Sequence, residues 1–242
     1  MELAFQIAKC VAWAPGVETE QEWCLWQAEK HDFSSDISLP ALKAIPAMQR
    51  RRLSPFAKVS LHCALEASDH RQGDLPCVFS SRHGDLNRTT KLIENVAAKE
   101  DLSPTQFGLS VHNAVSGLYS IYTKNQAPIS AIASGKTSFM AGLVDSVVKL
   151  HVNQLDHILY VYTDLSVPDC YSGYLDTNES IGIGLLIQAS AFQGEGFKLS
   201  SATTNHAVLM GIQSLDFLNF YYGDAISWNT PVNKQTWTLT KN

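Results

Sequence analysis

The sequence predicts an α/β fold in which a mixed or mainly parallel sheet carries helices on its faces. Apolar segments of strand length alternate along the chain with stretches of helical periodicity, which is the pattern of such folds. The 242 residues are 45% hydrophobic, which is enough to fill a sizeable core. No repeat, low-complexity stretch or flexible linker is visible, so we expect a single domain over residues 1–242.

Capping and turn residues place the elements of the N-terminal part. Pro15-Gly16 is a turn signal that ends the first strand, and Ser54 followed by Pro55 is typical of a helix start. The predicted elements are, in order, a strand at 3–14, a helix at 19–30, a helix that runs from Ser54 to residue 67, a strand at 75–81 and a helix at 85–100. Leu92, Ile93 and Val96 are expected to form the inner stripe of the last helix, and residues 105–110 to form a loop.

The central stretch, residues 111–146, reads as helix, short strand, tight turn and second helix. Asn113 is a plausible N-cap for the first helix, and Pro128 prevents that helix from continuing. Residues 129–133 have the composition of a buried strand. The apolar positions at helical spacing are Val115, Leu118, Tyr119 and Tyr122 in the first helix and Phe139, Met140, Leu143 and Val147 in the second.

The turn between this strand and the second helix has a geometry that can present a nucleophile to an oxyanion hole. Its residues are Ser134-Gly135-Lys136, so its tip carries a lysine and no cysteine. Further strands are predicted at 157–163, which the carboxylate Asp164 follows, at 181–192 and at 237–240.

Composition argues against several classes of function. The net charge of −5 does not favour nucleic-acid binding. The five cysteines form no CxxC pair and the eight histidines form no HxxxH or HExxH pair, so we expect neither a metal nor another cofactor. No apolar run approaches the roughly 20 residues of a membrane span, and the N-terminus lacks the basic region of a signal peptide. We therefore expect a cytoplasmic protein.

Other local patterns favour structural explanations. Ser134–Thr137 resembles the end of a phosphate-binding loop, but Ser130 stands where that motif needs a glycine. Gly182-Ile183-Gly184 is best explained by close backbone packing within a strand. His112 is expected to bond the local backbone as a cap-region residue.

Several segments, in the same order, carry a resemblance to the β-ketoacyl synthases of the thiolase-like superfamily. They are residues 12–16, at the turn after the family's first strand; residues 48–54, before its first long helix; Ser103-Pro104 and residues 112–117, before its nucleophile; and residues 132–138, where active synthases carry a cysteine motif. The chain resembles, more narrowly, the short chain-length-factor-like subunits of aryl polyene biosynthesis. The resemblance covers about residues 5–192 and implies a thiolase-like fold corresponding to the N-terminal half of a ketosynthase.

Two departures from the family imply that the chain is catalytically silent on its own. Counted without gaps from Asn113, the nucleophilic cysteine position falls on Lys136; with four residues missing it falls on Ile132. Neither residue supplies the thiolate that attacks an acyl thioester. The family's two decarboxylation histidines belong to a C-terminal half that the chain does not reach, and we expect this length to leave apolar helix faces uncovered.

The resemblance also implies a partner, because ketosynthases are dimers in which a loop of one subunit reaches towards the partner's acyl tunnel. The expected partner is a full-length ketosynthase, with an acyl carrier protein bound through the complex. The implied interface or tunnel residues are Gln106, Phe107, His112, Asn113, Val115, Tyr119 and Tyr122. Ordinary core packing is the alternative for Phe107, Tyr119 and Tyr122. Arg50, Arg51 and Arg52 form either a solvated face or a contact for an acidic carrier protein.

Three hypotheses remain open from the sequence. The chain is a non-catalytic partner of a ketosynthase, an acyl-processing hydrolase or acyltransferase that uses Ser134, Ser138 or Lys136, or a scaffold without a tunnel role. A hydrolase needs a base near its serine, and no spacing in the sequence nominates one.

Overall fold

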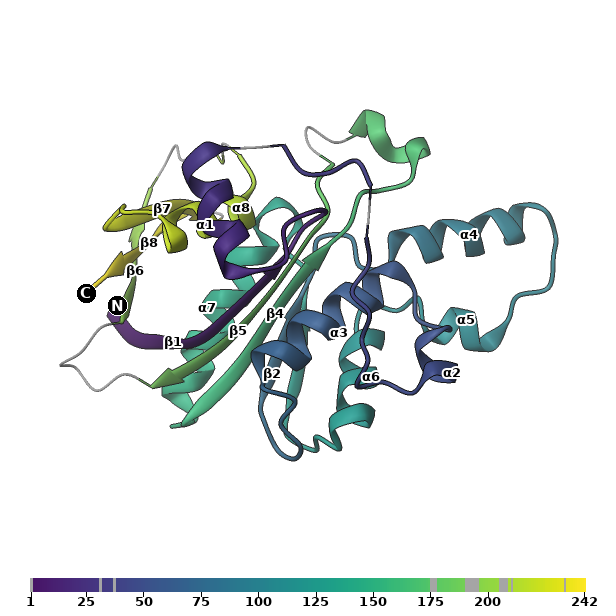
Figure 1. Ribbon diagram of the computed structural model, residues 1–242, viewed down its shortest axis with the longest axis horizontal. Coiled ribbons are helices and arrows are strands. Elements are labelled where there is room, and N and C mark those ends of the chain that lie inside the picture. Colours follow the sequence, from purple (N-terminus) through teal and green to yellow (C-terminus); the bar gives the residue numbers. More distant parts are fainter. Residues whose placement is uncertain are drawn as a thin grey trace.

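A computed structural model describes residues 2–30, 32–36, 38–174, 178–189, 196–204, 209, 211–232 and 234–242. Within these residues one eight-stranded sheet organises the chain (Figure 1). Its strands are, from one edge to the other, β3 (Ile129–Ile132), β2 (Cys77–Ser80), β4 (His157–Asp164), β5 (Ile181–Ala189), β1 (Glu2–Trp13), β6 (Phe197–Thr203), β8 (Gln235–Lys241) and β7 (Ser227–Val232).

The sheet is mixed, as predicted. Strand β2 runs parallel to both β3 and β4, because helical connections separate these strands along the chain. The other neighbouring pairs are antiparallel. The parallel part is therefore confined to β3, β2 and β4, and the mainly parallel alternative is not what the structure has.

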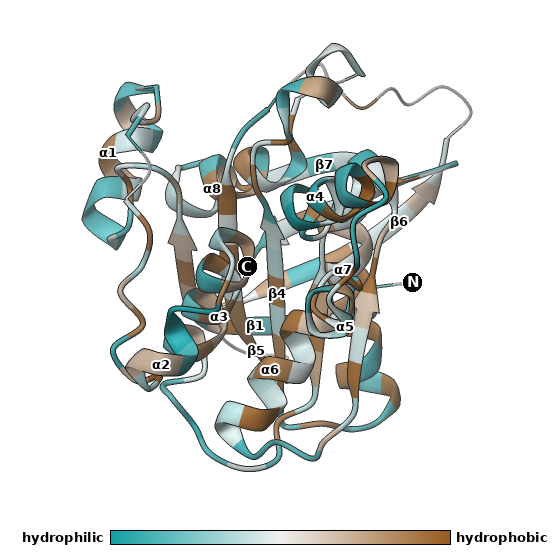
Figure 2. Ribbon diagram, turned by 90° about the vertical axis from the view of Figure 1, so that its right-hand side faces the viewer, coloured by the Kyte–Doolittle hydropathy of each residue, from teal (hydrophilic) through white to brown (hydrophobic). Residues whose placement is uncertain are grey.

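Helices cover both faces of the sheet. They are α1 (Glu20–Glu29), α2 (Ala47–Arg50), α3 (Pro55–Ala67), α4 (Leu86–Ala97), α5 (Pro104–Gly108), α6 (Ala114–Thr123), α7 (Ser138–Val152) and α8 (Gln213–Tyr222). One core lies between the sheet and α3 and α6, and the other lies between the sheet and α7, α8 and Trp23 of α1. Hydrophobic ribbon colour gathers in the strands and in the helices against them, whereas α4 is largely hydrophilic (Figure 2).

Helix α3 lies so close to the sheet that two strand positions admit only glycine. A Cβ atom on Gly182 would lie 2.5 Å from Cγ1 of Val59, and one on Gly184 would lie 2.2 Å from the carbonyl oxygen of Cys63. The helix begins as predicted, since the Ser54 hydroxyl accepts a hydrogen bond from the Ala57 N–H. The interpretation of these glycines as a close-packing feature is confirmed.

Three local predictions are wrong. In α4 Leu92 is nearly buried, but Ile93 and Val96 are 53% and 59% exposed, because this helix extends away from the sheet (Figure 1). Residues 104–108 form the short helix α5, which the Ser103 hydroxyl caps, where a loop was expected. Strand β3 is only partly buried because it is the edge strand of the sheet.

The C-terminal elements were largely missed by the sequence prediction. The strand predicted at 181–192 is β5, which ends at Ala189, and residues 190–195 lie outside the described residues. Strands β6 and β7 and helix α8 were not predicted. Phe217 of α8 packs on Phe139 of α7, with ring centroids 5.0 Å apart, and Trp228 of β7 lies 6.3 Å from the same ring. The expectation of an uncovered apolar face is therefore wrong for α7, whose apolar side these elements bury.

Searching the described residues for a helix able to cross a membrane found none that is long and apolar enough.

Candidate functional site

The candidate site lies where the three parallel strands end. Strands β3, β2 and β4 are parallel, so their C-terminal ends lie next to one another. This brings together the turn after β3, the turn after β2 and Asp164 at the end of β4. The carboxyl ends of parallel strands are where α/β folds place their ligands.

The turn after β3 uses its own hydroxyl groups to hold its shape. The Ser134 N–H donates to Oγ of Ser138 at 2.9 Å, and that hydroxyl donates to the Gly135 carbonyl at 2.8 Å. Thr137 Oγ1 donates to the Ser134 carbonyl at 2.8 Å. Gly135 has a φ of +56°, a left-handed conformation that favours glycine at this position.

The start of α7 is held by side chains from three other elements. Oγ of Ser80 donates to the Ser138 carbonyl at 2.6 Å, and the Tyr160 hydroxyl donates to the Phe139 carbonyl at 2.5 Å. The N–H of Met140 donates to Oε1 of Gln213 at 3.1 Å. An amide in the first turn of a helix can stabilise an oxyanion, but this one already has a protein acceptor.

This geometry gives no support to a serine nucleophile. Ser138 is buried, and no hydrogen bond between described residues joins Ser134 or Ser138 to a histidine or a carboxylate. A serine without a base is a weak nucleophile. Lys136 lies at the exposed tip of the turn, in a 3₁₀ segment at Gly135–Thr137.

Asp164 is the most heavily hydrogen-bonded carboxylate of the described residues and holds the turn after β2. It accepts the Ser81 hydroxyl at 2.8 Å and the N–H groups of Arg82 and His83 at 2.9 and 3.1 Å. The Tyr162 hydroxyl completes the shell at 2.7 Å. Burial raises the pKa of Tyr162 well above its ordinary value, and the nearby Asp164 charge raises it further, so the phenol stays protonated and donates.

His112 reaches this turn rather than its own helix terminus. Its Nε2 donates to the carbonyl of Ser81 at 3.1 Å, across 31 residues of sequence. The carbonyl can only accept, so the proton is on Nε2. The expectation of a local backbone contact for His112 is wrong, because the turn after β2 lies against the start of α6.

The predicted interface residues fall into two groups. Gln106 and Phe107 lie on α5 and are exposed, Phe107 by 59%, and Asn113 is also exposed. Val115 and Tyr119 are buried in the core beneath α3 and α6, and the Tyr119 ring lies 5.8 Å from that of Phe79. Tyr122 is partly buried against the same core. Core packing thus accounts for Val115 and Tyr119, while α5 offers its side chains outwards.

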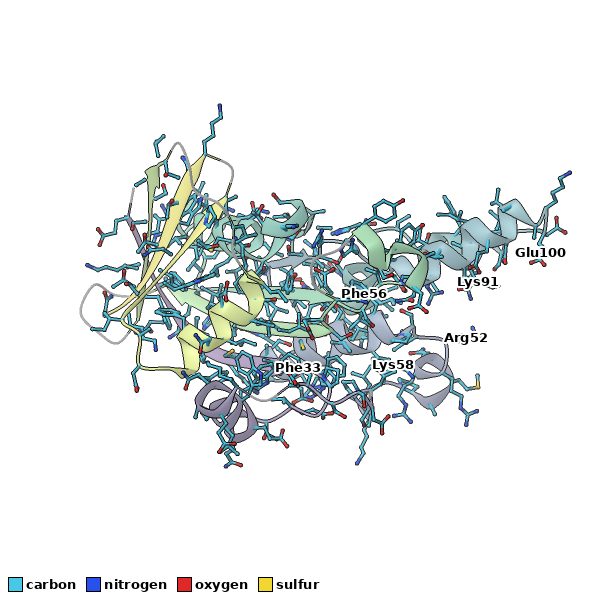
Figure 3. All side chains as sticks on the ribbon, turned by 90° about the horizontal axis from the view of Figure 1, so that it is seen from above. Phe33, Arg52, Phe56, Lys58, Lys91 and Glu100 are labelled. Atoms are coloured by element: carbon cyan, nitrogen blue, oxygen red, sulfur yellow. The ribbon has the colours of Figure 1, made fainter. Side chains whose placement is uncertain are left out.

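A groove with basic side chains is lined both by arginines of the predicted carrier-protein contact and by Gln106 of the predicted tunnel contact. A cavity of about 530 Å³ lies between α2, the start of α3, α4 and α5 and is lined by Arg51, Arg52, Arg88, Lys91 and Gln106, among others. Two of these lining residues, Arg52 and Lys91, are labelled in Figure 3. Arg50 instead donates to the Leu42 carbonyl at 3.2 Å. Arg88 and Lys91 were missed because they are 36 or more residues from the arginine run in sequence.

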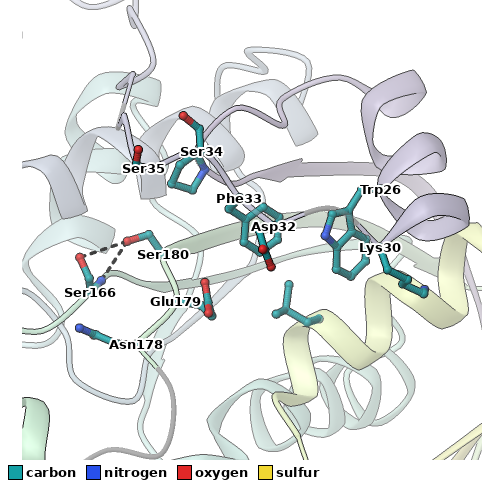
Figure 4. A pocket seen from close by; sticks show the side chains of 12 residues that line it. Trp26, Lys30, Asp32, Phe33, Ser34, Ser35, Ser166, Asn178, Glu179 and Ser180 are labelled. Carbon is teal, nitrogen blue, oxygen red and sulfur yellow. Dashed lines mark hydrogen bonds between the residues drawn. The ribbon is translucent and has the colours of Figure 1, made fainter.

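A second cavity, of about 590 Å³, lies apart from these features (Figure 4). Trp26 and Phe33 stack beside it at 5.7 Å, and Asp32 and Glu179 are among its polar lining residues. Across the described residues no group of three or more histidine, cysteine or acidic side chains is placed to hold a metal ion.

The fold and the strand–turn–helix site define a class, the thiolase-like N-terminal half of a ketosynthase. The sequence matches the family model of the β-ketoacyl synthase N-terminal domain over residues 23–239, and the chain belongs to this family. A search of curated protein sequences found no match.

Solved structures agree with this assignment. A chain of the ketosynthase ApeO in complex with its chain length factor ApeC, from Xenorhabdus doucetiae, is 26% identical with a TM-score of 0.84, and the match covers 98% of this chain and 99% of that one. The ishigamide ketosynthase/chain length factor is 14% identical with a TM-score of 0.60, over 83% of this chain and 67% of that one. A ketosynthase of the bacillaene synthase from Bacillus subtilis 168 is 11% identical with a TM-score of 0.60; the match covers 42% of its length and 84% of this chain.

Proposed function

We propose that this chain is a non-catalytic, chain-length-factor-like subunit that pairs with a full-length ketosynthase in type II aryl polyene or polyketide assembly. The observation that carries the proposal is the turn at residues 134–138, which has no thiol and whose hydroxyl groups bond within the turn. Support comes from the ketosynthase–chain length factor complex, one chain of which this protein matches over nearly the full length of both.

The chemistry of condensation supports a silent subunit. The growing acyl chain must be transferred to a thiolate before it can be extended, and a hydroxyl without a base or an exposed ammonium does not replace that thiolate. The five cysteines are free but none lies in this turn. We infer that the partner performs the chemical steps and that residues 1–242 act as one domain.

The unpaired edge of β3 favours a partner at this end of the sheet. In the part of the chain that the structure describes, β3 pairs with β2 on one side and with no strand on the other. The N–H groups of Cys77 and Ser81 donate to the carbonyls of Pro128 and Ile132. Since alternate residues of a strand point their backbone groups to opposite sides, the N–H and C=O of Ala131 face the open edge.

Exposed apolar side chains accompany this edge. Ile121 of α6, a helix that contacts β3, is 72% exposed, and Phe107 of α5 is 59% exposed. Apolar side chains beside an unpaired strand are a suitable surface for a stable interface. The partner contact would bury on the order of 2,000 Å² or more, as permanent complexes do.

The α5 residues and the basic groove supply the finer roles. We assign to Gln106 and Phe107 the contact with the partner's acyl tunnel, because they are exposed on a helix that projects from the sheet (Figure 1). Arg51 and Arg52, together with Arg88 and Lys91, give the groove a concentration of positive charge that suits an acidic carrier protein.

Co-purification tests the pairing. The chain is expressed with a ketosynthase from its own pathway and passed over a size-exclusion column with light-scattering detection. We expect a stable complex of both chains. A well-behaved monomer that ignores the ketosynthase would contradict the proposal.

A further inference from the structure

Asp164 forms a clasp around the turn Ser81–Gly84. Its two carboxylate oxygens accept one side-chain and two backbone donors from this turn, and the carboxylate is 7% exposed. Ser81 Oγ also accepts the Gly84 N–H at 2.7 Å, which closes the turn on itself. Hydrogen bonds to a buried carboxylate are stronger than those between neutral groups, so this turn is fixed to the end of β4.

The clasped turn supports the beginning and the end of a projecting arm, residues 86–111. At the beginning, Asp85 caps α4 and its Oδ2 pairs with Nε of Arg88 at 3.0 Å, and Arg88 also donates to the side chain of Gln106 on α5. At the end, His112 donates to the Ser81 carbonyl at 3.1 Å. Asp85 and Ser81, the two residues at which the arm is attached, both belong to or adjoin the turn that Asp164 holds.

The His112 ring lies beside Gly84 of the turn. A Cβ atom on Gly84 would lie 3.5 Å from Cδ2 of His112, and Gly84 has a φ of +61°, which favours glycine. Leu92 and a hydrogen bond from Asn87 to the Ser166 carbonyl add support near the beginning of the arm, whereas Ile93, Val96 and Phe107 are all more than half exposed. The end of α4, at Glu100, projects away from the body in Figure 3.

We propose that Asp164 and His112 are positioning residues that fix the arm relative to the sheet and thereby set the direction in which Gln106 and Phe107 point. The positions of these two side chains are then determined inside the subunit before it meets a partner. The consequence for product length rests on the proposed function; the clasp itself does not.

Hydrogen–deuterium exchange on the isolated chain tests the clasp. His112→Phe keeps an aromatic ring and removes the donor, and His112→Gln restores a donor near the position of Nε2. We expect His112→Phe to speed amide exchange in peptides covering residues 104–113 about tenfold or more, while peptides from α7 keep their wild-type rate. His112→Gln should return the arm to within about twofold of wild type.

A matched control and a second variant complete the experiment. His70→Phe changes an exposed histidine of a different region, whose side chain pairs with Glu66, and should leave the arm unchanged. Asp164→Asn replaces an accepting oxygen with a donating NH₂ group among backbone N–H donors, so both the arm and residues 81–84 should exchange faster. Arm exchange in His112→Phe equal to wild type, or failure of His112→Gln to restore it, would overturn the proposal.

The reconstituted complex separates this inference from the proposed function. If the wild-type chain forms the complex, His112→Phe should broaden the distribution of product lengths, and His112→Gln should narrow it again. An unchanged distribution beside faster arm exchange would overturn the part that concerns product length. If the wild-type chain forms no complex, the proposed function fails. The exchange data on the isolated chain would still show whether Asp164 and His112 fix the arm.

Discussion

At the scale of single residues, the turn after β3 supports the proposal that this chain is chemically silent. Every hydroxyl of the turn closes a bond within it, and the Met140 amide in the first turn of α7 is bound to Gln213. A nucleophile requires the reverse arrangement, in which the reactive atom is free and a base lies beside it.

Incubation with acyl-carrier thioesters should therefore leave the chain unmodified. Intact-mass spectrometry is expected to show the unacylated mass after prolonged reaction, because no thiolate lies at the turn. Boiling the sample first provides a control for slow, unspecific acylation of exposed lysines. Stoichiometric acylation of the native chain at Lys136, Ser134 or Ser138 would favour the acyl-processing enzyme over the silent subunit.

At the scale of elements, the packing of α3 on β5 depends on two glycines. The separation between the helix backbone and Gly184 leaves no space for a methyl group, since the added Cβ would overlap a main-chain oxygen at 2.2 Å. Main-chain atoms of a buried helix cannot rotate away as a side chain can, so the helix or the strand would have to shift.

Gly184→Ala should lower the free energy of unfolding by about 1–3 kcal/mol, the usual cost of overpacking a core. Urea denaturation followed by circular dichroism measures it. Gly117→Ala is the matched control: it adds the same methyl group in α6, where nothing lies within 4 Å, and should stabilise by about 0.5–1 kcal/mol. Equal effects of both substitutions would show that the α3–β5 separation is wider than described.

The edge of β3 gives a second test at this scale. Ala131→Pro removes an N–H that faces the open edge and leaves the bonds to β2 in place, which is where a sheet tolerates proline. Affinity for the ketosynthase, measured by biolayer interferometry, should fall about tenfold or more, the loss expected when a partnered backbone donor is removed.

The stability of the isolated Ala131→Pro chain should change little, and Ala131→Thr, which keeps the N–H, serves as the control. Affinity that survives the proline would place the partner elsewhere on the surface.

The sequence predicted best those elements whose ends are marked by capping residues, prolines or glycines. Ser54-Pro55 started α3, and Pro128 with Gly135 bounded β3. Ser103-Pro104 has the same form, but it was interpreted as the start of a loop, so α5 was missed. Strands β6 and β7 and helix α8 lack such signals, and their apolar residues are interrupted by polar ones, so only part of β8 was anticipated.

Contacts between residues that are distant along the chain could not be predicted from the sequence, because they depend on the tertiary fold. The partial exposure of β3 follows from its place at the edge of the sheet, which depends on the order of all the strands. The bond from His112 to Ser81 joins residues 31 positions apart, and the burial of Val115 and Tyr119 depends on how α6 packs under α3. The strand–turn–helix order at residues 129–152 was predicted, but the hydrogen bonds that hold the turn and the start of α7 involve Ser80, Tyr160 and Gln213, which only folding brings together.

At the scale of the whole molecule, the two ends of the sheet differ within the described residues: one is covered by the C-terminal elements, and the other has an unpaired edge strand. The C-terminal elements β6, β7, β8 and α8 extend the sheet and bury the apolar side of α7. The opposite end presents the unpaired edge of β3 together with α5 and α6. This asymmetry suits the proposed subunit, which pairs with one permanent partner.

The product-length profile of the reconstituted complex, read by mass spectrometry, tests the central claim most directly. Phe107→Ala removes an exposed ring and should give longer products, since a growing chain can enter the vacated space. Gln106→Trp adds bulk and should give shorter ones, and Lys136→Ala should leave condensation running. Identical profiles for wild type, Phe107→Ala and Gln106→Trp, or a complex that Lys136→Ala inactivates, would contradict the account of a silent subunit that sets chain length.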